Sequence, residues 1–80
     1  MDETLFKDPY RKALLELVRS IDAEIGLSEE NGVLILWKLD THEKISRFNR
    51  WVQSRLHNGK LQATETEIVG AAVEVSKGLI

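Results

Sequence analysis

Residues 33–39 read VLILWKL, and the conformation of this stretch decides the fold class of the 80-residue chain. The stretch is apolar on every side except at Lys38, so its periodicity alone does not distinguish a short buried helix from a buried strand. The preceding Ser28-Glu29-Glu30-Asn31 favours a helix, because Ser28 can act as the cap and the two acids then lie near the positive end of the helix.

The alternative is a strand at residues 33–39. Asn31-Gly32 just before it is a hairpin-type turn signal, but the chain holds no second strand-like run. A strand here would therefore have to pair with its copy in a second chain. We expect a short buried helix, with the strand as the alternative.

Upstream, the sequence predicts an amphipathic helix at about residues 9–25. Asp8-Pro9 is typical of a helix start, and Gly26 is typical of a helix end. The apolar side chains between them recur on one face: Tyr10, Leu14, Leu17, Val18, Ile21 and Ile25.

Downstream, two more helices are predicted at about residues 41–57 and 64–79, separated by an Asn58-Gly59 turn. Each begins with a cap residue followed three positions later by Glu, in Asp40-Thr41-His42-Glu43 and in Thr64-Glu65-Thr66-Glu67. The expected core positions are Ile45, Phe48, Val52 and Leu56 in the first helix, and Ile68, Ala71, Ala72, Val75 and Leu79 in the second.

These signals together predict a single all-α domain over residues 1–80. We expect a compact bundle of three to four short helices at about residues 9–25, 29–39, 41–57 and 64–79. The longest apolar run has five residues, and the start Met1-Asp2-Glu3-Thr4 does not resemble a signal peptide. We therefore expect a cytoplasmic protein without a membrane partner.

Catalytic and metal-binding patterns are absent from the sequence. There is no Cys, and His42 and His57 lie about 22 Å apart if one helix carries both. The five glycines are scattered singly, so no phosphate-binding loop is present. We expect no enzyme activity, metal, cofactor or small-molecule substrate.

The net charge of −2 hides a basic centre between two acidic ends. Residues 42–60 carry five bases and one acid, whereas residues 1–41 carry nine acids and five bases. Lys44, Arg47, Trp51 and Arg55 fall on one flank of the predicted third helix. Such a flank suits an acidic protein surface or phosphates, because Trp and Arg are frequent interface hot spots and cations contact phosphates.

A third interpretation of this flank is internal. Trp51 would then pack beneath a neighbouring helix, and the arginines would pair with acids of the first helix, such as Glu16, Asp22 or Glu24. Trp51→Ala distinguishes the two cases, because the substitution collapses the fold only if Trp51 belongs to the core.

The last predicted helix is apolar over much of its circumference. Val69, Val73 and Ile80 form a second apolar line beside its core positions. A domain of this size cannot easily bury so wide an arc, so these residues predict a homodimer.

The functional prediction is a non-enzymatic regulatory or accessory module that binds a protein partner. The alternative is a DNA-binding dimer that uses the basic segment at residues 44–60. If residues 33–39 are a strand, the element order over residues 33–79 resembles the ribbon-helix-helix repressors, but only Lys38 would offer a polar group to DNA. A helix-turn-helix would present the acidic Thr-Glu-Thr-Glu start of its second helix to phosphates, which disfavours that docking.

Overall fold

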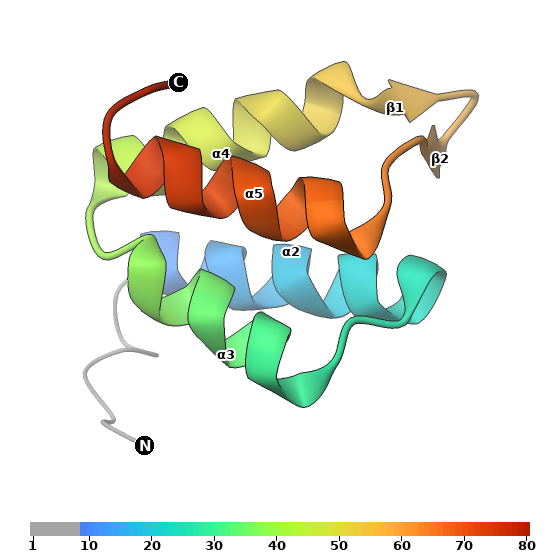
Figure 1. Cartoon of the computed structure of the whole chain (residues 1–80), viewed down its shortest axis with the longest axis horizontal. Coiled ribbons are helices and arrows are strands. Elements are labelled where there is room, and N and C mark those ends of the chain that lie inside the picture. Colours follow the sequence, from blue (N-terminus) through green and yellow to red (C-terminus); the bar gives the residue numbers. More distant parts are fainter. Residues whose placement is uncertain (1–8) are drawn as a thin grey trace.

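The computed structural model describes residues 9–80, and the predicted helix-start residue Asp8 lies outside them. In this part of the chain the fold is all-α, as predicted, with one very small sheet (Figure 1). Its elements are α2 (Pro9–Ile25), α3 (Glu29–Lys38), α4 (His42–Ser54), β1 (Leu56–His57), β2 (Lys60–Leu61) and α5 (Glu65–Ser76).

The helices are arranged so that α3 and α4 lie on opposite sides of the bundle. The main contacts join α2 to α3 and α4, and join α5 to the same two helices. Figure 1 shows α4 along the top of the molecule and α3 along the bottom, with α2 and α5 between them. Each of the two outer helices therefore has a face that neither α2 nor α5 covers.

Residues 33–38 are helical, which confirms the helix over the strand. Ser28 is the N-cap, and its hydroxyl accepts the backbone N–H of Asn31 at 3.2 Å. The helix is less buried than expected, because only Ile35 within it and Leu39 just after it are fully covered. A helix at the edge of a bundle touches its neighbours on one side only, so its other apolar residues remain exposed.

Both ends of α3 are held by polar contacts from other helices. At its start, the Ser28 N–H donates to a carboxylate oxygen of Glu65 on α5 at 2.5 Å. At its end, Arg11 of α2 donates to the backbone carbonyls of Leu36 and Leu39. These contacts satisfy backbone groups that a helix leaves unpaired at its termini.

The prediction that α4 continues to residue 57 is wrong, because a β-hairpin ends it at Ser54. Asn58 and Gly59 have φ values of 54° and 77°, and two positive φ values in a row are typical of a type I′ hairpin turn. The flanking residues consequently pair as β1 and β2. Leu56, expected in the core, is 38% exposed.

The predicted caps are partly correct. Thr64 and Glu67 form the full capping box at the start of α5. The N-cap of α4 is Thr41, whose hydroxyl accepts the Lys44 N–H, and Asp40 instead binds the Lys44 side chain.

The predicted end of α5 at residue 79 is wrong. The helix ends at Ser76, and Gly78 follows with a φ of 78°. The Leu79 N–H donates back to the Glu74 carbonyl at 2.9 Å, which turns the chain away from the helix axis. Leu79 is consequently 71% exposed and does not belong to the core.

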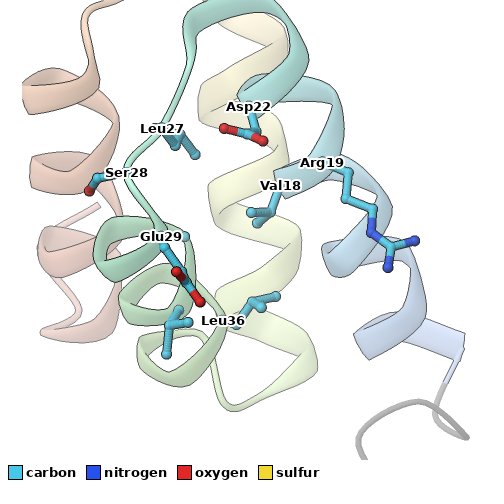
Figure 2. Close-up of a pocket in the computed structure, with 9 residues that line it drawn as sticks. Val18, Arg19, Asp22, Leu27, Ser28, Glu29 and Leu36 are labelled. Carbon is cyan, nitrogen blue, oxygen red and sulfur yellow. The ribbon is translucent and has the colours of Figure 1, made fainter.

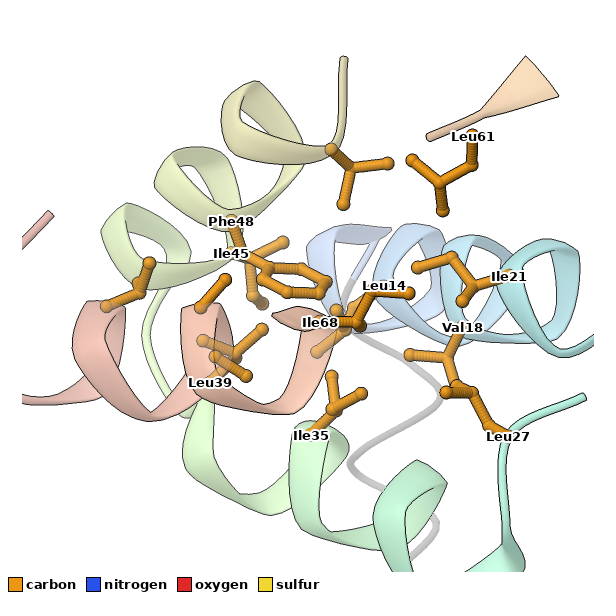
Figure 3. Packing of buried hydrophobic residues seen from close by; sticks show 14 residues of the cluster. Leu14, Val18, Ile21, Leu27, Ile35, Leu39, Ile45, Phe48, Leu61 and Ile68 are labelled. Carbon is orange, nitrogen blue, oxygen red and sulfur yellow. The ribbon is translucent and has the colours of Figure 1, made fainter. Parts of the chain in front are cut away.

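One hydrophobic core joins the four helices (Figure 3). Its largest fully buried side chains are Phe48, Leu14, Ile35, Leu39, Ile68 and Val75. Tyr10 was expected on the buried face of α2, but it is half exposed and its ring stacks on that of His42 at 4.1 Å. Of the described helices, none combines the length and the hydropathy needed to cross a membrane.

Candidate functional site

Lys44 and Arg47, the first two of the predicted partner-binding residues, form ion pairs within α4 and its cap. The Lys44 ammonium lies 2.9 Å from a carboxylate oxygen of Asp40, and the hydrogen bond and charge of Lys44 lower the pKa of Asp40. The Arg47 guanidinium lies 2.6 Å from a carboxylate oxygen of Glu43. Local acids therefore neutralise the N-terminal half of the basic segment.

Trp51, the third, contributes to both the core and the surface. It is partly buried against the core and stacks with Phe48, with ring centroids 6.4 Å apart. The guanidinium of Arg55, the fourth, lies over the Trp51 ring, 5.0 Å from its centroid. The Trp51 ring is therefore partly packed against the core, while the rest of it remains accessible.

The predicted ion pairs with first-helix acids are absent from residues 9–80. None of the α4 cations contacts Glu16, Asp22 or Glu24. Glu24 instead accepts the Leu61 backbone N–H at 2.7 Å, which ties the hairpin to the end of α2.

An open hollow of about 540 Å³ lies beside Trp51. Its walls are Arg47, Arg50, Trp51, Ser54 and Ile80. Arg50 is exposed and forms no hydrogen bond or ion pair with any residue of the described chain. We call Arg47, Arg50, Trp51, Arg55 and Ile80 the Trp51 surface.

The three residues predicted for self-association do not form one line. Val69 and Val73 are half-buried on α5. Ile80 lies beyond the turn at Gly78, and its carbonyl accepts an N–H of Arg47 at 3.2 Å. Because of this turn, Ile80 is placed against α4 and belongs to the Trp51 surface.

A second aromatic surface, on α3, was not predicted. Trp37 is 59% exposed and Val33 is 43% exposed, one helical turn apart. Together with Leu34, Glu29 and Glu30 they line an open hollow of about 520 Å³. We call these five residues the Trp37 surface.

The Trp37 surface continues into the groove between α2 and α3 (Figure 2). This groove has a volume of about 400 Å³ and shares Glu29 and Val33 with the Trp37 surface. Val18, Arg19 and Asp22 of α2 line its other side. The exposed α3 face is therefore apolar at its centre and predominantly acidic around it.

The sequence did contain a signal for this surface. Glu29, Val33 and Trp37 are spaced four residues apart, so a helix places them on one face, opposite the buried pair Ile35 and Leu39. A helix whose residues 33–37 are apolar on every side cannot bury both of its faces at the edge of a small bundle.

Within residues 9–80, no three His, Cys, Asp or Glu side chains come together in a way that could hold a metal ion. Comparison with protein-family models, curated protein sequences and solved structures gives no match for this chain.

Proposed function

We propose that this domain is a non-catalytic interaction module that binds an acidic, apolar protein segment through the Trp51 surface. The observation that carries the proposal is Arg50, an exposed cation without an acidic partner in the described chain, at the edge of a hollow lined by Trp51 and Ile80. Trp and Arg are the residues most often found as interface hot spots.

The surface offers two kinds of contact. Trp51 and Ile80 provide an apolar wall that can hold an aliphatic or aromatic side chain. Arg50 and Arg55 can each bind a carboxylate through two parallel N–H donors. The Phe48 stacking and the Arg55 contact hold the Trp51 ring in place, which reduces the entropy that binding would cost.

The charge arrangement favours an acidic protein over nucleic acid. Phosphate binding gains strength from many unpaired cations along one face. Here Asp40 and Glu43 already pair with Lys44 and Arg47, and both acids would lie close to a bound phosphate backbone. Repulsion between these two carboxylates and the phosphates would weaken DNA binding.

The test is an NMR titration of the full chain with an amphipathic acidic peptide of about 20 residues, a length that supports helix formation. A basic peptide of the same apolar pattern and a short DNA duplex serve as comparisons. We expect the acidic peptide alone to shift the Trp51 indole N–H and the Arg50 amide.

Arg50→Ala should weaken binding of the acidic peptide at least about tenfold, as is typical of a hot-spot arginine. The matched control is Arg19→Ala on α2, which is also exposed but lies outside the Trp51 surface. An unchanged affinity in Arg50→Ala contradicts the proposal. Tighter, steeply salt-dependent binding of the duplex would instead support the DNA-binding alternative.

A further inference from the structure

We propose that the acidic partner of the Trp51 surface is the Trp37 surface of a second copy of this chain, so that copies join head to tail. This inference rests on the proposed function of the Trp51 surface. Its basis is the complementarity of the two surfaces: one presents an aromatic ring with unpaired cations, and the other presents an aromatic ring with unpaired acids.

The acids of the Trp37 surface are available for such a contact. Glu29 and Glu30 are exposed and form no ion pair within residues 9–80. Some other acids of residues 9–80 are engaged: Glu24 accepts the Leu61 N–H and Glu65 accepts the Ser28 N–H. Glu29 and Glu30 are the unpaired acids that line the hollow beside Trp37.

The spacing of the contact groups also matches. On α3, Glu30 lies one turn before Val33 and Leu34. On α4, Arg55 lies one turn after Trp51, and Arg50 lies next to it. An α3 helix laid along α4 of another copy can therefore place its carboxylates at the arginines while an aliphatic side chain enters the hollow beside Trp51.

Charge favours the mixed contact over contacts that superpose two like surfaces. Two Trp37 surfaces facing each other would bring Glu29 and Glu30 of both copies into one interface, and two Trp51 surfaces would gather Arg47, Arg50 and Arg55 of both. Like charges across an interface disfavour both contacts. The mixed contact instead sets Glu29 and Glu30 of one copy against Arg50 and Arg55 of the other.

The positions of α3 and α4 prevent this assembly from closing with two copies. The two helices lie on opposite sides of the bundle, so one pair of copies cannot engage both contacts at once (Figure 1). Each added copy leaves a Trp37 surface free at one end and a Trp51 surface free at the other. A contact of this kind gives chains of copies rather than a closed dimer.

The first test is sedimentation of the full chain from micromolar concentration up to about 1 mM, at about 50 mM and about 500 mM salt. We expect the average mass to rise beyond that of a dimer at low salt and to fall at high salt. Glu30→Lys and Arg50→Glu should each abolish this growth. The double variant should restore it, because the charges are exchanged across the same contact.

Matched controls are Glu16→Lys and Lys12→Glu on α2, which reverse exposed charges that line neither surface nor the groove between α2 and α3. Both should behave like the unmodified chain. A double Glu30→Lys, Arg50→Glu variant that stays monomeric contradicts direct pairing of these two residues. Circular dichroism melts should show that each variant remains folded.

A mixing experiment tests the polarity of the contact. Trp37→Ala removes one surface and Arg50→Glu removes the other, so each chain alone should be a monomer, while an equimolar mixture should stop at a 1:1 dimer. A mixture that stays monomeric overturns the head-to-tail arrangement. A monomeric unmodified chain that still binds the acidic peptide overturns only the second-copy partner, whereas a chain that does not bind the peptide overturns the proposed function itself.

Discussion

Replacing Arg11 with Met tests whether a single α2 side chain holds the C-terminal end of α3. One guanidinium nitrogen of Arg11 donates to the Leu36 carbonyl at 3.0 Å and also to the Leu39 carbonyl. Carbonyls in the last turn of a helix have no partner within the helix. Methionine keeps most of the aliphatic stem of the side chain but removes both hydrogen bonds.

The expected loss follows from the number and exposure of these bonds. A hydrogen bond from a charged donor contributes about 1.5–3 kcal/mol. Arg11 is only half-buried, so water can replace part of the contact, and Met recovers some of the rotamer entropy that ordered Arg loses. We therefore expect Arg11→Met to lower the free energy of unfolding by about 1–3 kcal/mol, with a fall in Tm of about 4–8 °C for each kcal/mol.

The assay is urea and thermal denaturation followed by circular dichroism. The urea midpoint should fall while the slope of the transition stays constant, because the fold itself is unchanged. Arg19→Met is the matched control, an exposed arginine on the same helix with no hydrogen bond in the described chain. If Arg11→Met and Arg19→Met differ by less than about 0.5 kcal/mol, the contact with α3 does not stabilise the fold.

Four further substitutions test other parts of the structure. Glu65→Gln should make the free energy of unfolding less sensitive to acid. The hydrogen bond from the Ser28 N–H lowers the pKa of Glu65, so the stability that this carboxylate contributes is present above the ordinary pKa of 4.5 and is lost as the pH falls through the pKa of the folded state. Measuring the free energy of unfolding against pH for both chains checks this. Gly70→Ala should raise the free energy of unfolding by about 0.5–1 kcal/mol, because Gly inside a helix loses more conformational entropy than Ala and nothing lies within 4 Å of the added methyl group. Gly59→Ala should lower it in the same urea assay, because a φ of 77° is strained for Ala. Phe48→Ala should cost about 3–5 kcal/mol, and a smaller loss would contradict its place at the centre of the core.

The features that depend on residues close together in the sequence were predicted correctly. Pro9 and Gly26 bound α2 as expected, and the Thr64–Glu67 box begins α5. The Asn58-Gly59 turn was also correct, but its consequence was missed. A type I′ turn aligns its flanking residues as strands, so it shortens the preceding helix rather than merely joining two helices.

The two surfaces likewise combine features that local sequence predicts with features that depend on distant parts of the chain. Arg47 and Trp51 of α4 and its C-cap residue Arg55 lie together because they follow one another along the same helix face, and helical spacing is sufficient to predict that. Ile80 joins them only after the chain reverses at Gly78 and passes back to α4. The exposure of Trp37 depends on which neighbours cover α3, and no pattern within residues 33–39 specifies those neighbours.

The charge blocks along the sequence take on a more specific meaning once the local pairs are known. Asp40 and Glu43 neutralise Lys44 and Arg47 inside one helix and its cap, so the basic block leaves Arg50 and Arg55 as the cations available at the Trp51 surface. In the acidic block, Glu24 is used by the hairpin, whereas Glu29 and Glu30 remain unpaired beside Trp37. A contact between these leftover charges involves only two arginines and two glutamates, with apolar burial between them. Salt should therefore weaken such a contact to a limited degree, in contrast to the steep dependence that many phosphate contacts would give.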